Sequence, residues 1–205
     1  MRLFVIRHGR TDWNEQGLAQ GHSNIPLSTL GHNQAEALGE AFRGVEVDQI
    51  LCSDLQRAVE TATPIAKVTG IEIETRTDLR ERSFGEWEGR PFTDLHNEMD
   101  ELARKIGMTR LEVQPPKGES FQHVWGRLDD VMEVIHNATG TLVIVTHGGT
   151  ASVLLSRLVR GTLHTSRSFR FDNCSITELF RRPDGVHIIE RVNDTAHLRS
   201  LRKEA

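Results

Sequence analysis

Two runs of consecutive apolar residues, at positions 3–6 and 142–145, are the clearest hydrophobic signal in the chain. Both are short and rich in β-branched residues, which is typical of strands buried on both faces of a parallel sheet. Shorter or alternating apolar patterns predict further strands at 49–52, 71–74, 175–180 and 186–192. The turn sequence Pro183-Asp184-Gly185 indicates that the last two strands form a hairpin.

Helical spacing of apolar residues fills the intervals between these strands. It predicts helices at 34–42, 55–68, 92–106, 120–138 and 150–159. Pro64 is expected to interrupt the second helix, because proline lacks the N–H that continues the hydrogen-bond ladder. The helix at 120–138 is expected to be the longest, with an apolar stripe that includes Val124, Leu128 and Ile135.

The alternation of strands and helices predicts an α/β fold with a largely parallel sheet that helices cover on both faces. No internal repeat, low-complexity segment or linker divides the sequence, so residues 1–205 are expected to form a single domain. The charged tail after Leu198 is expected to be partly disordered.

Composition narrows the class of protein. Of the 205 residues, 37% are hydrophobic and 26% are charged with both signs interleaved, and the net charge is −4. A nucleic-acid partner is not expected, because such proteins usually carry a basic face. No apolar run approaches 18 residues, so neither membrane insertion nor export is expected. Cys52 and Cys174 fit neither a metal site nor a disulfide framework, which favours the reducing cytoplasm.

Histidines follow the two most apolar strands directly. His8 comes after the run at 3–6, His147 comes after the run at 142–145, and each precedes a glycine. Ligands of open α/β sheets bind beyond the carboxyl ends of the strands, so the two imidazoles share one crevice if these strands are neighbours. Arg7 precedes His8, and Arg57 lies at the start of a helix that follows a third strand end.

Two histidines and two arginines that converge indicate an anion site, because a guanidinium can hold two phosphate oxygens at once. A neutral imidazole in line with phosphorus can act as a nucleophile, and nearby arginines lower its pKa and keep it neutral. A carboxylic acid must then protonate the leaving oxygen. The loop at 79–89 offers Glu81, Glu86 and Glu88, and the residues alone do not choose among them.

Each of these residues also has a structural interpretation when it is taken alone. Arg57 could be a solvated helix residue, and Trp13, Phe84 and Trp87 are interpreted as packing residues. The occurrence of these residues together, at the ends of separate strands, favours a catalytic site over separate structural roles. No phosphate-binding glycine loop, dinucleotide motif or nucleophile elbow occurs, and no carboxylate pair stands beside either histidine. We therefore expect neither a metal nor another cofactor.

Five segments resemble, in order, the motifs of the histidine phosphatase superfamily, also called phosphoglycerate mutase-like. They run along the chain as Arg7-His8-Gly9-Arg10-Thr11-Asp12-Trp13-Asn14, Ser53-x-Leu55-x-Arg57-Ala58, Leu79-x-Glu81-x-x-Phe84-Gly85-x-Trp87-Glu88-Gly89, Pro116-Lys117-Gly118-Glu119-Ser120 and Val145-Thr146-His147-Gly148-Gly149. The resemblance implies a three-layer α/β/α sandwich with a mostly parallel central sheet, and an activity that needs no metal.

The resemblance also implies roles for individual residues. His8 would be the phosphorylated nucleophile, and Glu81 the proton donor and later the base that activates water. The phosphate site would be formed by Arg7, Arg57, His147 and Gly148 and bordered by Asn14, Gln20 and Gly21. Arg10 replaces a commoner glutamate and is expected to face solvent or to add positive charge at the rim. The expected partner is a small phosphate ester, and the chain could be a monomer or a homodimer.

The superfamily contains both mutases and phosphatases. Gly149 stands where mutases usually carry asparagine, and only residues 90–117 lie where mutases have a longer insertion. The run from Phe84 to Gly89 is similar to small bacterial phosphatases of broad specificity, whereas Glu81-Arg82-x-Phe84-Gly85 partly resembles the mutase loop. The main hypothesis is a phosphatase that hydrolyses small phosphate monoesters through a phosphohistidine on His8. A cofactor-dependent phosphoglycerate mutase and a non-catalytic phospho-ligand binding module are the alternatives.

Overall fold

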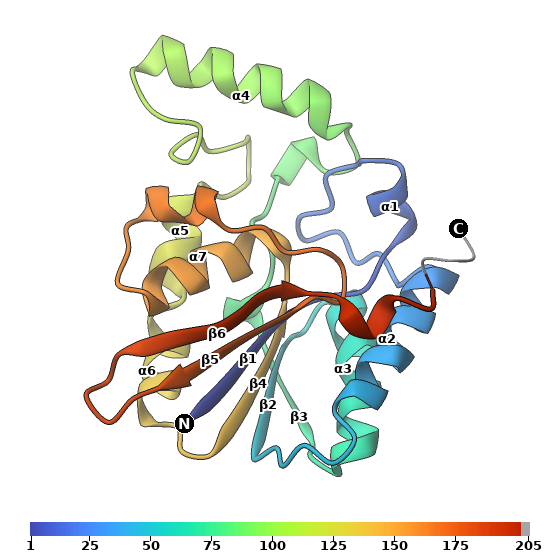
Figure 1. Ribbon diagram of the computed structural model, residues 1–205. Helices are drawn as coiled ribbons and strands as arrows, with labels where there is room; N and C mark the ends of the chain where they lie inside the picture. The colour runs from blue at the N-terminus through green and yellow to red at the C-terminus, as the bar shows by residue number, and fades with distance from the viewer. Residues whose placement is uncertain (202–205) are drawn as a thin grey trace.

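A computed structural model describes residues 1–201, and within them one sheet has the strand order β3-β2-β4-β1-β5-β6 (Figure 1). The strands β1 (Arg2–Arg7), β2 (Gln49–Ser53), β3 (Ile73–Arg76) and β4 (Thr141–Thr146) are parallel. The hairpin of β5 (Ile176–Arg181) and β6 (His187–Asp194) joins the edge of β1 in the antiparallel sense. The sheet is therefore mixed and mostly parallel.

The two most apolar strands are neighbours, as a crevice shared by His8 and His147 requires. Ile6 of β1 lies beside Val145 of β4 on one side and beside Ile176 of β5 on the other. Since β1 and β4 are parallel, Arg7 and His8 leave the sheet next to Thr146 and His147. The carboxyl ends of these strands thus bring both histidines to the same edge.

Helices cover both faces of the sheet (Figure 1). On one face, α2 (Thr29–Ala41) and α3 (Gln56–Thr69) pack against Phe4 and Ile6. On the other, α5 (Phe121–Arg127), α6 (Asp129–Asn137) and α7 (Gly148–Leu158) pack against Leu3 and Val5. Alternate residues of β1 supply the two cores, because successive side chains of a strand point to opposite faces. The expected three-layer α/β/α sandwich is confirmed.

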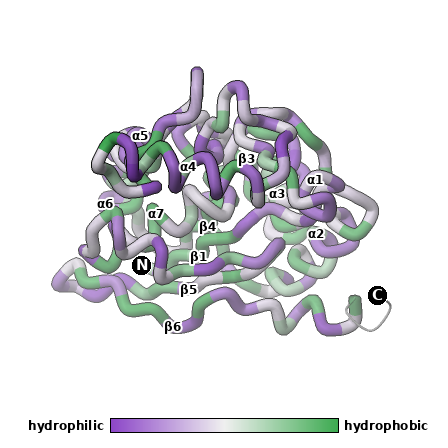
Figure 2. The backbone as a smooth tube through the Cα atoms, turned by 90° about the horizontal axis from the view of Figure 1, so that it is seen from above, coloured by the Kyte–Doolittle hydropathy of each residue, from purple (hydrophilic) through white to green (hydrophobic). Residues whose placement is uncertain are grey.

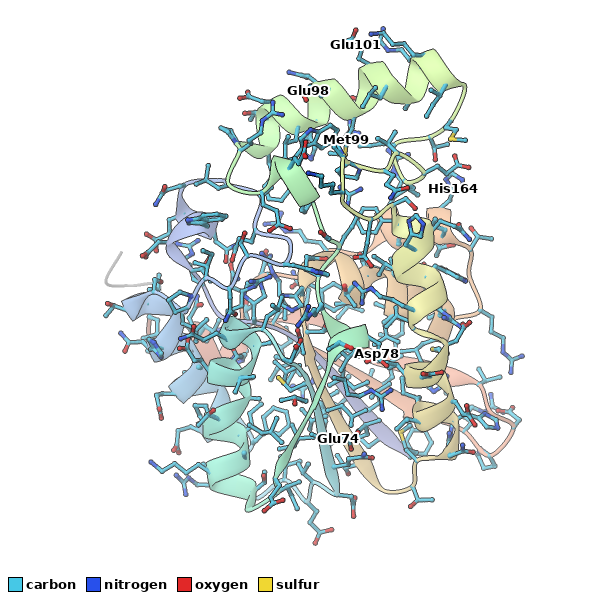
Figure 3. All side chains as sticks on the ribbon, turned by 180° about the vertical axis from the view of Figure 1, so that it is seen from behind. Glu74, Asp78, Glu98, Met99, Glu101 and His164 are labelled. Atoms are coloured by element: carbon cyan, nitrogen blue, oxygen red, sulfur yellow. The ribbon has the colours of Figure 1, made fainter. Side chains whose placement is uncertain are left out.

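Two further helices, α1 (Asp12–Glu15) and α4 (Phe92–Ile106), lie beyond the carboxyl ends of the strands (Figure 1). Figure 2 shows hydrophobic segments along β1 and β4 and a largely hydrophilic α4. One side of α4 buries Leu95, Met99 and Ala103, and Figure 3 shows Met99 on the side that faces the body while Glu101 lies on the outer side. Within residues 1–201, short 3-10 helices occupy Thr77–Leu79, Gly85–Trp87, Leu163–Ser168 and Ala196–Leu198.

Two helix predictions were wrong. Pro64 does not interrupt α3, because the proline packs against the helix α2 at Gly39, where a Cβ would lie 2.7 Å from the Pro64 Cβ. The predicted helix at 120–138 is two helices, α5 and α6, which separate at Leu128, where ψ is 2°. Gly126, a weak helix former, precedes this break. The strand at β3 is shifted two residues from the predicted 71–74, and α1 was not predicted.

No helix within residues 1–201 combines the length and the hydropathy that crossing a membrane requires. Cys52 and Cys174 are buried and not joined by a disulfide. The end of the charged tail, residues 202–205, lies outside the described residues, and so does the expectation of disorder there.

Candidate active site

A cavity of about 180 Å³ opens beyond the carboxyl ends of the central strands. Its lining residues are Arg7, His8, Asn14, Gln20, Gly21, Arg57, Glu81, Arg82, Phe84, Phe92, Phe121 and Gly149. Seven of the residues singled out in the sequence therefore meet in one place. His147 and Gly148 are not in the lining; His147 is fully buried behind it, and Gly149 rather than Gly148 reaches the cavity wall.

His8 presents one free ring nitrogen. Its Nδ1 lies 2.7 Å from the Gly9 carbonyl oxygen, so Nδ1 carries the proton and donates it. Nε2 then holds the lone pair. Burial, followed by the charges of Arg57 and Arg7, places the pKa of His8 well below its usual value. The imidazole is therefore neutral and nucleophilic at physiological pH.

The backbone around His8 is held by a segment that sequence reasoning missed. The Asn173 side-chain amide donates to the carbonyl oxygens of His8 at 3.0 Å and of Gly9 at 3.2 Å, and also to Asn14 Oδ1 at 3.2 Å. The Cys174 N–H donates to the Arg7 carbonyl at 3.0 Å. Asn173 acts mainly on backbone atoms, so no motif in the sequence indicates it. These bonds fix the loop that carries His8 against the segment that directly precedes β5.

Arg57, His147 and Ser53 form a buried chain of hydrogen bonds. Arg57 Nε donates to His147 Nδ1 at 3.2 Å, and His147 Nε2 lies 2.8 Å from Ser53 Oγ. Because Nδ1 accepts, the single proton of the neutral ring sits on Nε2 and is donated to Ser53. Burial, with help from Arg57, keeps the pKa of His147 well below its usual value. Both ring nitrogens are thus engaged with the protein.

The guanidinium of Arg57 is also held by two carbonyl groups of the loop after α1. Nη1 donates to Ser23 O at 2.8 Å and Nη2 to Gly21 O at 2.7 Å. Burial lowers the pKa of Arg57 to about 10, so it stays protonated at neutral pH. A fixed positive charge therefore stands beside His8.

Arg7 and Gln20 line the cavity, and each has a buried polar atom without a hydrogen-bond partner within residues 1–201. Arg7 Nη1 donates to Phe171 O at 2.7 Å, whereas its Nε is buried without a partner among residues 1–201. Gln20 Oε1 is likewise buried without a donor within that range. Unpaired buried polar atoms are costly, so a donor and an acceptor of this kind indicate that a polar ligand completes the site.

The structure separates the three candidate glutamates. Only Glu81 lines the cavity, where Oε2 accepts from Gly149 N at 3.0 Å and Oε1 from Thr150 N at 3.2 Å at the start of α7. Glu86 is exposed and pairs with Lys117. Glu88 is a structural residue that accepts from His22 N at 2.9 Å and from Ser23 Oγ at 2.6 Å. Position alone favours Glu81 as the acid.

Aromatic side chains and one further arginine form the other end of the cavity. Phe84, Phe92 and Phe121 line it together with Arg82. The interpretation of Phe84 as a packing residue was incomplete, since it both packs and lines the cavity. Arg82 was noted only as part of a motif, because a single arginine in a charged loop carries no signal of burial. Arg10 is exposed and borders a separate hollow.

Within residues 1–201, no cluster of three or more His, Cys, Asp and Glu side chains is placed to hold a metal ion. The charges gathered at the cavity are chiefly those of arginines, which suit an anion better than a cation. A buried neutral imidazole and fixed guanidinium groups can accept the phosphoryl group of an ester, and one carboxyl group can protonate the oxygen that leaves.

Residues 3–195 match the family described as the histidine phosphatase superfamily (branch 1), and the chain belongs to this superfamily. A curated relative from Yersinia enterocolitica, "Probable phosphoglycerate mutase GpmB", is 32% identical over 97% of this chain and 95% of its own length.

Several similar solved structures have phosphatase names. The alpha-ribazole phosphatase of Shigella flexneri has a TM-score of 0.82 and 30% identity, over 95% of this chain and 96% of its own. The phosphoserine phosphatase of Entamoeba histolytica, in complex with 3-phosphoglyceric acid, has a TM-score of 0.79 and 29% identity, over 96% and 98% of the two chains. A mutant of that enzyme is in complex with phosphoserine. Homologues of this chain thus bind small phosphate esters.

Proposed function

We propose that the chain is a metal-independent phosphatase that hydrolyses small phosphate monoesters through a phosphohistidine on His8. One observation carries the proposal. The His8 imidazole is neutral and tethered through Nδ1, with its lone-pair nitrogen free, and it shares a cavity with Arg7, Arg57 and Glu81. The phosphatase names of the structural relatives agree with it.

In the first step, Nε2 of His8 attacks phosphorus and the bond between phosphorus and the ester oxygen breaks. Glu81, protonated when the ester binds, gives its proton to the departing alkoxide, so that an alcohol leaves. Arg7 and Arg57 stabilise the equatorial oxygens. His147 holds Arg57 Nε at 3.2 Å, and we assign it the positioning of this guanidinium; it would reach the phosphate only after Arg57 releases it.

In the second step, water attacks the phosphohistidine. The Glu81 carboxylate takes a proton from the water, the bond between phosphorus and Nε2 breaks, and inorganic phosphate leaves. Glu81 is again protonated and His8 is again neutral, which closes the cycle. The glycine-lined backbone at Gly21 and the side chains of Asn14 and Gln20 would border the bound phosphate.

The test measures phosphate release from p-nitrophenyl phosphate and a panel of alkyl phosphates in the presence of EDTA. We expect turnover that survives EDTA, is absent in His8→Ala, and gives an acid-labile phosphoprotein when stopped with base. Turnover that persists in folded His8→Ala, or wild-type protein that releases no phosphate from any ester, contradicts the proposal.

A mutase is the second candidate, because the curated relative at 32% identity has that name. Gly149, in place of the asparagine that mutases usually carry, favours the phosphatase. A coupled assay of 3-phosphoglycerate isomerisation, primed with 2,3-bisphosphoglycerate, separates the two. Mutase flux that exceeds phosphate release from the same substrate would establish the second candidate.

A further inference from the structure

We propose that Asn173 is a positioning residue for phosphoryl transfer, and that it holds Asn14, which lines the cavity, against the backbone of His8. This inference rests on the proposed function, since it concerns the geometry of the same reaction. It follows from the three acceptors that converge on a single amide nitrogen, Asn173 Nδ2.

The amide group of Asn14 has only one polar atom left for a ligand. Its Oδ1 accepts from Thr11 N at 3.2 Å, from Thr11 Oγ1 at 3.1 Å and from Asn173 Nδ2 at 3.2 Å. An amide oxygen has two lone pairs, so three donors saturate it. Its Nδ2 forms no hydrogen bond with the described residues, so this nitrogen is the atom that remains for an anion in the cavity.

Backbone groups determine the orientation of both amides. Thr11 N can only donate, so the Asn14 atom that it contacts is the oxygen. The carbonyl groups of His8 and Gly9 can only accept, so the Asn173 atom that they contact is the nitrogen. The orientation of Asn14 therefore suits a phosphoryl group, because an N–H attracts a phosphoryl oxygen and an amide oxygen in its place would repel it.

One nitrogen joins Asn14 to the backbone around His8. Asn173 Nδ2 lies 3.0 Å from the His8 carbonyl oxygen and 3.2 Å from that of Gly9. The Gly9 carbonyl also accepts from His8 Nδ1 at 2.7 Å, and this bond leaves the lone pair on Nε2. Asn173 thus contacts the carbonyl group that orients the His8 ring as well as the residue that offers an N–H to the phosphate.

Little else holds the helix that carries Asn14. The helix α1 has no buried residue, and its capping box joins Asn14 to Thr11 within the same turn. Among the hydrogen bonds that the described chain makes to residues 12–15, the one from a distant segment is that of Asn173 Nδ2. The position of Asn14 relative to His8 therefore depends on this bond.

The segment around Asn173 is itself well fixed. Cys174 N donates to the Arg7 carbonyl at 3.0 Å. The Asn193 amide accepts from Asp172 N at 2.6 Å and donates to its carboxylate at 3.0 Å. Asn173 lines a separate hollow and not the catalytic cavity. It can therefore act on the reaction through Asn14 and the His8 backbone without touching the substrate.

A misplaced Asn14 weakens the transition state more than the ground state. In the transition state, phosphorus must lie in line with His8 Nε2 while its equatorial oxygens meet their donors. A bound phosphate ion forms no bond to Nε2, so it can settle to follow a displaced donor. Orthovanadate, which binds a nucleophile in a five-coordinate geometry, resembles the first state, and inorganic phosphate resembles the second.

The test measures binding of orthovanadate and of inorganic phosphate to the wild type and to Asn173→Ala by calorimetry. We expect the affinity for vanadate to fall by about tenfold and that for phosphate by about twofold or less. The kcat for p-nitrophenyl phosphate should fall about as far as the vanadate affinity, with KM little changed. A merely structural role would lower the folded fraction and change both affinities by the same factor. Equal changes, or no change in either affinity, would overturn the inference.

A double-mutant cycle tests whether Asn173 acts through Asn14. In the Asn14→Ala background, Asn173→Ala should lower the vanadate affinity by only about threefold or less, because the amide that it holds is gone. The residual loss comes from the bonds to the carbonyl groups of His8 and Gly9. Losses that multiply as those of independent residues would overturn the inference.

Asn193→Gly is the matched control. Asn193 holds the neighbouring Asp172 through both amide atoms and forms no hydrogen bond to residues 8–14 of the described chain. Its φ is 53°, which glycine adopts without strain, so the substitution removes the side chain and keeps the backbone. We expect lower stability and an unchanged ratio of the vanadate and phosphate affinities. A ratio that changes as in Asn173→Ala would assign the effect to the turn and contradict the inference.

The binding measurements distinguish a failure of this inference from a failure of the proposed function. A selective loss of vanadate binding in Asn173→Ala, with no phosphate release from any ester by the wild type, contradicts the proposed function alone. Phosphate release by the wild type, with equal losses of both affinities in the variant, contradicts the positioning role alone. If Asn173→Ala does not fold, Asn173→Ser replaces it, because the serine hydroxyl ends one bond short of the amide nitrogen.

Discussion

The absence of a side chain at Gly149 sets the position of the candidate acid. Its N–H donates to Glu81 Oε2 at 3.0 Å, and a Cβ built on it would lie only 2.4 Å from Glu81 Oε1. The carboxyl group therefore occupies space that any other residue at 149 would take. The asparagine that mutases usually carry at this position could not coexist with the present placement of Glu81.

We predict that Gly149→Ala displaces the Glu81 carboxyl group and lowers activity according to the leaving group. Turnover of alkyl phosphates should fall by about 100-fold, the range of general acid catalysis, and that of p-nitrophenyl phosphate by much less. The reason is that p-nitrophenolate leaves without a proton. Steady-state kinetics on both substrates, with Glu81→Gln for comparison, measure the effect.

Gly126→Ala is the matched control for this prediction. Apart from its chain neighbours and the backbone of its own helix α5, nothing in the described residues lies within 4 Å of a Cβ at Gly126, so the same chemical change there meets open space. Equal losses on both substrates in Gly149→Ala would argue that the substitution disturbs the site generally and not the acid.

The sequence indicates residues that line the cavity better than residues that hold them in place. The segments around His8, Arg57 and Glu81 carry motifs, and all three residues line the cavity. Ser53 and Asn173 were not assigned roles, because a hydroxyl that accepts from an imidazole and an amide that binds backbone carbonyls are common in any protein. Only the folded chain shows what they touch.

At the scale of elements, Glu88 ties together two loops that surround the cavity. Its Oε1 accepts from Phe84 N at 3.2 Å and from His22 N at 2.9 Å, so it joins the acid loop to the loop after α1. The second loop supplies the carbonyl groups of Gly21 and Ser23 that hold Arg57. Glu88 thus positions Arg57 without lining the cavity itself.

We predict that Glu88→Gln lowers both stability and activity. The amide oxygen can still accept from Phe84 N and His22 N, but these bonds weaken without the negative charge, and the amide NH2 cannot accept from the Ser23 hydroxyl. We expect a loss of about 1–3 kcal/mol in the free energy of unfolding. Because the carbonyl groups of Gly21 and Ser23 that hold Arg57 then shift, kcat/KM for p-nitrophenyl phosphate should fall by about tenfold. Urea denaturation and steady-state kinetics measure the two effects.

Glu86→Gln makes the same change two residues earlier and serves as the control. Its ion pair with Lys117 is exposed, and such pairs contribute about 0–1 kcal/mol. Similar losses of stability and activity in Glu86→Gln and Glu88→Gln would show that the hydrogen bonds of Glu88 between the two loops are not the cause.

Element boundaries were predictable where the local pattern and the tertiary packing agree. The predicted helix at 92–106 coincides with α4, whose one buried side has regular helical spacing. The predictions failed at Pro64, where packing against Gly39 favours a continuous helix, and at Leu128, where the apolar stripe continues although the helix does not. The short α1 is held by the Thr11 cap and has no buried residue, so no apolar pattern indicates it.

On the scale of the whole molecule, the fold buries two neutral imidazoles beside fixed positive charges. Burial, followed by Arg57, lowers the pKa values of His8 and His147 far below the value of about 6.5 expected for the unfolded chain. Below pH 6.5 the unfolded chain therefore binds more protons than the folded chain. The free energy of unfolding therefore decreases as the pH falls through this range.

We predict that the free energy of unfolding decreases between pH 6.5 and pH 5, and that His8→Asn reduces the slope by up to about 1.4 kcal/mol per pH unit. The variant no longer takes up this proton on unfolding. Other histidines whose pKa is lowered by partial burial, such as the half-buried His197, contribute in the same direction and remain in both proteins. Urea denaturation at a series of pH values measures the slopes, with the exposed His32→Asn as the control. Identical slopes in wild type and His8→Asn would contradict the expectation.

The central place of β1 in the sheet has a consequence for synthesis in the cell. Its sheet neighbours are β4 at residues 141–146 and β5 at residues 176–181, so β1 pairs with strands that are synthesised much later than itself. At ordinary translation rates this apolar segment waits on the order of ten seconds for a partner. During that interval it is a ready binding site for chaperones, and the ribosome releases His8 long before Asn173 and Cys174, which hold its backbone.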